Sequence, residues 1–94
     1  MGVVFRQLSK HQKAKSCYEK AIKINPNYAS AHNNLGEVFR LLGELQKAKS
    51  CHQKAIEIDS NNASAHNNLG EVFRLLGELQ KAKSCHQKAI EINP

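Results

Sequence analysis

The sequence predicts an all-α solenoid of stacked antiparallel helical hairpins, because it is repetitive and its apolar residues follow helical spacing. Ala31 to Ile58 recurs 34 positions later as Ala65 to Ile92 without a single difference. Self-similarity at such a period is typical of helical repeat arrays. The first thirty residues form a more divergent copy that lacks its front, with matches at Gly2, Phe5, Leu8, Ala14, Cys17, Ala21 and Ile24. We therefore expect about two and three-quarter repeats and five to six helices.

The length of the chain limits it to one small repeat domain. With 94 residues, it is near the size at which a single core has little surplus stability. We predict one domain over residues 1–94, divided into a partial repeat at 1–28 and repeats at 29–62 and 63–94. Stability then has to come from stacking between neighbouring units. Identical tandem copies fit a recent duplication and an engineered repeat equally well.

Each complete unit begins with an amphipathic helix that a glycine ends. The apolar residues fall at i, i+4, i+7, i+8 and i+11, the spacing of one helical face: Ala31, Leu35, Val38, Phe39 and Leu42. Gly43 follows and is suited to the left-handed conformation that often ends a helix. The pattern predicts that the chain reverses its direction at Gly43.

A second amphipathic helix follows from Glu44 and completes the hairpin. Its apolar face carries Leu45, Ala48, His52, Ala55 and Ile56. The polar stretch from Asp59 to Asn62 then connects it to the next unit, with Asn62 as the expected N-cap of the following helix.

Small and apolar side chains are placed where the two helices have to approach closely. A glycine inside a helix costs about 1 kcal/mol relative to alanine, and a close helix contact would offset that cost. The residues that we expect to pack the repeats are Leu35, Gly36, Phe39, Ala48, Ala55, Leu69, Gly70, Phe73, Ala82 and Ala89.

The net charge of +6 resides mainly in the first copy. Residues 1–30 hold six basic side chains against the single acidic Glu19, whereas the later copies are nearly balanced. A basic stripe along the whole array is thus not supported. Binding of nucleic acid or another polyanion remains the alternative function, although aromatic residues for base stacking are missing beside the lysines.

The sequence favours a cytoplasmic location with reduced thiols. We find no apolar run of membrane-spanning length and no secretory signal at the start, MGVVFRQLSKHQK. The cysteines at 17, 51 and 85 occupy the same place in each copy. An odd number of cysteines separated by whole repeats is not a disulfide framework.

The order of these residues resembles the tetratricopeptide repeat, a helix-turn-helix unit of 34 residues. The resemblance covers the whole chain and rests on His32-x-x-Leu35-Gly36-x-x-Phe39 followed by Gly43, Ala48, His52 and Ala55. It implies a superhelix whose concave groove is formed mainly by the first helix of each unit. The sequence departs from the family pattern where histidine replaces a large apolar or aromatic residue, and where serine replaces the turn glycine or the linker proline: His32, His66, His52, His86, Ser9 and Ser60.

The resemblance places a polar row of side chains in that groove, with a leucine beside it in each unit. These candidate binding residues are Asn33, Asn34, Glu37, Arg40, Leu41, Asn67, Asn68, Glu71, Arg74 and Leu75. An amide both donates and accepts a hydrogen bond, so an asparagine ladder can bind the backbone of an extended peptide. Asn34 and Asn68 resemble the ladder of O-linked N-acetylglucosamine transferase. The alternatives are an ordinary solvated helix face and leucines that pack between repeats.

The histidines and cysteines form a second candidate cluster, for which we predict no metal. Zinc requires convergent ligands, yet Cys51 and His52 are consecutive on a helix and point about 100° apart. Half-buried imidazoles that replace aromatic core residues are favoured instead. The sequence also contains no phosphate loop or dinucleotide fingerprint, so we predict neither a cofactor nor catalysis.

The ends of the array predict self-association. Met1 lies within a first helix, and Pro94 follows a second helix without a polar capping helix, which solenoids normally require for solubility. We expect homo-oligomers formed by end stacking or hairpin exchange. Without a proline at Ser60, the helices on either side of it can also fuse. The predicted function is a non-catalytic scaffold that binds a protein or peptide partner in the groove.

Overall fold

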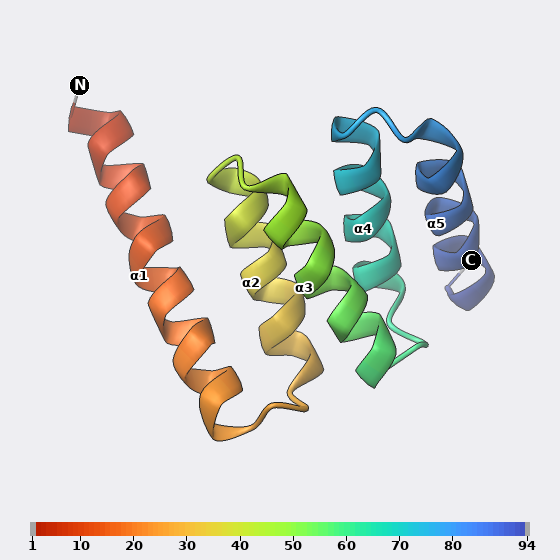
Figure 1. The fold of residues 1–94 in the computed structure, drawn as a ribbon, viewed down its shortest axis with the longest axis horizontal. Helices are drawn as coiled ribbons and strands as arrows, with labels where there is room; N and C mark the ends of the chain where they lie inside the picture. Colours follow the sequence, from red (N-terminus) through yellow and green to blue (C-terminus); the bar gives the residue numbers. More distant parts are fainter. Residues whose placement is uncertain (1, 94) are drawn as a thin grey trace.

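The computed structural model describes residues 2–93, with the side chains of residues 7–93, and contains α-helices but no strands in that range. Expectations that concern Met1, Pro94 and the side chain of Phe5 lie outside the described residues. The helices lie side by side in chain order (Figure 1), as α1 (Gly2–Ile24), α2 (Ala29–Leu41), α3 (Leu45–Ile58), α4 (Ala63–Leu75) and α5 (Leu79–Ile92). The predicted all-α solenoid is confirmed.

Glycines form the turns of the two hairpins, α2–α3 and α4–α5. Gly43 and Gly77 have φ angles of 80° and 81°, in the left-handed region that residues with a side chain rarely adopt. The N–H of Glu44 donates to the carbonyl of Phe39 at 2.8 Å, and the N–H of Gly43 donates to that of Arg40 at 3.0 Å. These two bonds form the Schellman motif, which ends α2 and reverses the chain.

The first copy differs from the expected remainder of a hairpin, because α1 is one continuous helix of 23 residues. Ser9 stands where the later copies have Gly43 and Gly77. Without a glycine, the left-handed turn is unfavourable, and the helix continues through this position. The structure therefore has five helices rather than six within the described residues.

The Ser60 linker separates α3 from α4 in this monomer, so the two helices are not fused. The Asp59 carboxylate accepts a hydrogen bond from the N–H of Asn61 at 3.2 Å. The side chain of Asn62 accepts from the N–H of Ala65 at 3.1 Å, which confirms the predicted N-cap. Fusion of these helices in an assembly stays a prediction, as do the repeat boundaries at 28 and 62.

The core runs from hairpin to hairpin through the apolar faces of the helices. One cluster joins Leu35, Phe39 and Ala48 of the first hairpin to Val72 of the second. A second cluster lies within the other hairpin. The ten residues that the sequence assigned to repeat packing are all buried. Because Val72 closes the cluster of the preceding hairpin, neighbouring repeats stabilise each other.

No described helix is long and apolar enough to cross a membrane. The cytoplasmic location stays a prediction.

Candidate peptide-binding groove

Most of the predicted groove residues lie on the side of α2 and α4 away from the core. Successive helical residues point about 100° apart, so Glu37 points about 200° and Arg40 about 100° away from the buried Phe39. Asn34 is exposed, and the neighbouring leucines are also largely exposed, at 49% for Leu41 and 42% for Leu75. The face thus offers amide, charged and apolar groups to a partner.

A row of paired charges crosses this face from α2 to α4. Arg40 donates hydrogen bonds to Glu37, and Arg74 donates to Glu71 in the same way. The hydrogen bond from Arg74, together with the charges of Arg74 and Arg40, lowers the pKa of Glu71. Because both guanidinium groups already bind a carboxylate, they have less capacity to attract an acidic ligand.

Asn33 is buried between the repeats rather than in the groove. Its Oδ1 accepts hydrogen bonds from the ring of His52 at 2.8 Å and from the amide of Asn68 at 3.1 Å. Its own amide lies at hydrogen-bond distance, 3.5 Å, from Ser64 Oγ. Asn33 therefore links α2 to α3 and to the next repeat. The side chain of Asn68 is partly used in the same network, which leaves Asn34 as the more available rung of the predicted ladder.

His52 is the fully buried centre of this network. Asn33 Oδ1 is a hydrogen-bond acceptor, because it also accepts a bond from the amide of Asn68. The bond between Asn33 and His52 therefore requires the proton on Nδ1 of His52. Nε2 then faces Gly36 and has no hydrogen-bond partner within the described part of the chain. Burial lowers the pKa of His52 to about 4, and the nearby charges of Glu37 and Arg40 act in opposite directions. The imidazole is therefore neutral at physiological pH.

The second hairpin contains the same pair in a more open setting. His86 Nδ1 lies 3.1 Å from Asn67 Oδ1, but here the asparagine is exposed and the histidine is half-buried. Sequence reasoning missed these pairs, because it treated both asparagines as surface groups. The recurrence of His52 and His86 nineteen positions after Asn33 and Asn67 was the available signal.

His32 and His66 each bond to the linker that precedes their own helix. The Nε2 atoms of His32 and His66 donate to the carbonyls of Pro26 at 2.9 Å and Ser60 at 3.1 Å. These contacts stabilise the turn before α2 and the turn before α4. In residues 7–93, no group of three His, Cys, Asp or Glu side chains is arranged to hold a metal ion.

The cysteines are free thiols in different environments. Cys17 is exposed, whereas Cys51 and Cys85 are half-buried. Burial, with a smaller contribution from the Glu19 carboxylate, raises the pKa of Cys51 to about 11. Burial also raises the pKa of Cys85. Both thiols of the complete hairpins are therefore uncharged and poorly nucleophilic at neutral pH.

The stacked antiparallel hairpins define the chain as a helical repeat protein, and comparison with known families agrees. A family model described as "Tetratricopeptide repeat" matches residues 28–94, and one described as "TPR repeat" matches residues 2–43. The chain belongs to the tetratricopeptide repeat family. A search of curated proteins found no match.

Two solved structures share the fold over nearly the whole chain. The crystal structure of MamA is 28% identical with a TM-score of 0.85, covering 97% of this chain and 53% of MamA. The first tetratricopeptide repeat domain of Spaghetti (RPAP3), bound to the HSP90 peptide SRMEEVD, is 22% identical with a TM-score of 0.89. That match covers 99% of this chain and 73% of the other. The chain thus spans about half the length of the MamA chain.

Proposed function

We propose that this protein is a non-catalytic interaction module that binds an extended peptide or a partner helix along the inner face of α2 and α4. The observation that carries the proposal is the repetition, in register, of an amide, a charge pair and an exposed leucine on both helices. The similar domain of RPAP3 was solved with a bound peptide, which supports this class of function.

The side chains of the face favour recognition of a peptide backbone and apolar side chains over recognition of acidic groups. The amide of Asn34 can donate to a peptide carbonyl and accept from a peptide N–H. Leu41 and Leu75, each next to the arginine of its charge pair, provide apolar contacts. A carboxylate ligand would first have to displace Glu37 or Glu71 from the arginines, which reduces its gain in binding free energy.

A peptide-display screen followed by substitution of Asn34 tests the groove. Asn34→Ala should weaken the selected peptides by about threefold or more, as expected for a lost hydrogen bond. Gln53→Ala, an exposed amide on α3, serves as the matched control. Asn34 is the better choice than Asn68, because removing Asn68 also disturbs the bond to Asn33. Equal affinities of the Asn34→Ala and unchanged proteins would refute the ladder.

We further propose that the protein self-associates through α5. Leu79 and Ile90 are 64% and 63% exposed. Their counterparts in α3, Leu45 and Ile56, are half-buried because they pack into the clusters that contain residues of α4. The outer face of α5 therefore presents the apolar side chains that α3 uses to hold the next repeat. This favours association of α5 with a second copy of the chain over exchange of hairpins.

Light scattering over a concentration series tests this second proposal. The unchanged protein should increase in average mass with concentration, and the variant Leu79→Gln with Ile90→Gln should remain monomeric. Leu75→Gln, an exposed leucine on α4, is the control and should leave the association intact. A strictly monomeric unchanged protein at high concentration would contradict the proposal.

A further inference from the structure

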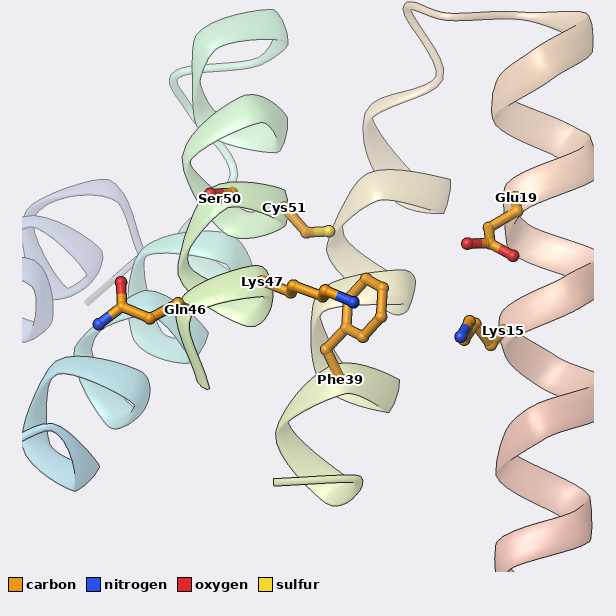
Figure 2. A pocket seen from close by; sticks show the side chains of 7 residues that line it. All are labelled: Lys15, Glu19, Phe39, Gln46, Lys47, Ser50 and Cys51. Atoms are coloured by element: carbon orange, nitrogen blue, oxygen red, sulfur yellow. The ribbon is translucent and has the colours of Figure 1, made fainter. Parts of the chain in front are cut away.

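A pocket lies on the other side of α2 from the proposed groove, between α1 and α3 (Figure 2). Its volume is about 460 Å³, and the ring of Phe39 forms part of its lining. Phe39 follows Glu37 by two residues, and therefore points about 200° away from it. The pocket is thus separate from the inner face and belongs to the outer surface of the repeats.

Two lysines from different helices converge on the Phe39 ring. The Nζ atoms of Lys15 on α1 and Lys47 on α3 lie 5.8 Å and 5.6 Å from the centroid of the ring. Figure 2 shows them approaching the ring from opposite sides. Both distances are within the range of cation–π attraction, which holds the ammonium groups at the pocket. Lys47 also contacts Glu44 at 3.2 Å, but this pair is exposed and is weak.

The rest of the pocket lining is formed by the Cys51 thiol, the polar side chains of Gln46 and Ser50, and one carboxylate. The Cys51 thiol faces the pocket and is uncharged, as described above. Glu19 of α1 also faces it and is the single acidic group in the lining. The pocket therefore combines the apolar Phe39 and Cys51 with two neutral polar side chains, two positive charges and one negative charge.

The next repeat contains a similar pocket with only one such lysine. It has a volume of about 320 Å³ and is lined by Phe73, Lys81 and Cys85, among others. Lys81 Nζ is 5.6 Å from the ring of Phe73. Lys49, the counterpart of Lys15, does not line this pocket. The second lysine therefore distinguishes the pocket at α1 from an otherwise repeated surface.

We propose that the pocket between α1 and α3 is a second protein-binding site, for an acidic segment in which an apolar side chain lies next to a carboxylate. The apolar side chain contacts Phe39 and Cys51, while the carboxylate lies between Lys15 and Lys47. Charge complementarity supports this partner, because the first thirty residues carry six basic groups against one acidic group. A nucleic acid fits less well, since Phe39 is the single aromatic residue in the lining and successive bases would have no row of rings on which to stack.

The binding test uses a fluorescein-labelled peptide of sequence Glu-Glu-Leu-Glu-Glu, blocked at both ends, measured by fluorescence anisotropy at physiological salt. Two control peptides replace the leucine by alanine or every glutamate by glutamine. We expect the parent peptide to bind best, because it alone has both features. Absence of binding at millimolar protein, or equal binding of the alanine peptide, would overturn the proposal.

Matched pairs of lysine variants then locate the site. Lys15→Gln with Lys47→Gln should weaken the parent peptide by about fivefold or more. Lys49→Gln with Lys81→Gln removes the same charge at the two equivalent positions, each 34 residues further along the chain, and should change affinity by less than about twofold. Glu19→Gln should strengthen binding, since it removes the acidic group from the rim. Equal losses in the two lysine pairs would show diffuse attraction and refute a defined site.

Two further measurements separate this pocket from the inner groove and from a general polyanion site. Asn34→Ala should leave binding of the acidic peptide unchanged, so that this proposal and the inner groove succeed or fail independently. A single-stranded oligonucleotide that binds more tightly than the peptide and depends on the same two lysines would identify a polyanion site, and would overturn the proposal of a protein partner.

Discussion

The ring of His52 packs directly against the backbone of Gly36, so that a Cβ atom at Gly36 would lie only 2.7 Å from the imidazole. This contact explains why a residue that weakens helices lies in the middle of α2. The imidazole is fully buried and is held by Asn33, so it has little room to move. The contact between α2 and α3 therefore depends on the absence of a side chain at Gly36.

Gly36→Ala should destabilise the protein, because the crowding outweighs the gain in helix propensity. Overpacking costs about 1–3 kcal/mol, and alanine returns about 1 kcal/mol, which leaves a net loss of up to about 2 kcal/mol. Urea unfolding monitored by circular dichroism measures the change. Gly70→Ala should cost less, since His86 is half-buried and can shift. Equal stability of the Gly36→Ala and unchanged proteins would contradict the interpretation.

Acidification should destabilise the fold through His52. The pKa of His52 is about 4 in the folded state and about 6.5 in the unfolded state. Between these values the unfolded chain binds more protons, so stability falls as the pH decreases from 6.5 to 4. The full loss is about 3 kcal/mol. Urea titrations across this window should show a smaller pH dependence of the unfolding free energy for His52→Gln than for the unchanged protein. An equal pH dependence in both proteins would count against His52 as the titrating group.

Asn33→Ala should be much more damaging than Asn67→Ala, although the two residues occupy the same repeat position. Loss of Asn33 leaves the buried Nδ1–H of His52 without its acceptor and removes the bond from Asn68, at a cost of about 1–3 kcal/mol. Asn67 is exposed, and water can replace it. The unfolding free energies of the two variants test this difference. Similar values would exclude a structural role for the inter-repeat network.

Cys17 should react with a thiol reagent well before Cys51. Cys17 is exposed, whereas Cys51 is half-buried with a pKa of about 11. At pH 8 only about one Cys51 thiol in a thousand is ionised, and the thiolate is the reactive form. Single-cysteine variants treated with a chromogenic disulfide measure each rate. Comparable rates in the folded proteins, with the urea-unfolded proteins as reference, would disprove the predicted difference.

Gly43→Ser should weaken the turn between α2 and α3 by about 1 kcal/mol or more, since serine in the left-handed region is strained. No atom lies within 4 Å of a Cβ built at Gly43, so the cost comes from the backbone and not from a clash. The substitution copies Ser9, where α1 continues as one helix. Thermal unfolding measures the loss, and an unchanged midpoint would show that glycine is not required there.

Features that depend on local or periodic patterns could be predicted from the sequence. The 34-residue identity and the spacing of apolar residues identified the helices of both complete hairpins. Gly43 and Asn62 marked a helix end and a helix start, because each acts through its own backbone and its near neighbours. The missing glycine at Ser9 was visible as well, although its consequence for α1 was not inferred.

Contacts between distant residues were decided only by the tertiary structure. In the sequence, Asn33 and Asn34 are adjacent amides on one helix, yet packing buries the first with His52 and leaves the second exposed. The convergence of Lys15 and Lys47 on Phe39 likewise depends on how α1 lies against the α2–α3 hairpin. Helical periodicity fixes the direction of a side chain on its own helix. What that side chain meets depends on the neighbouring helices, and therefore on how the whole array packs.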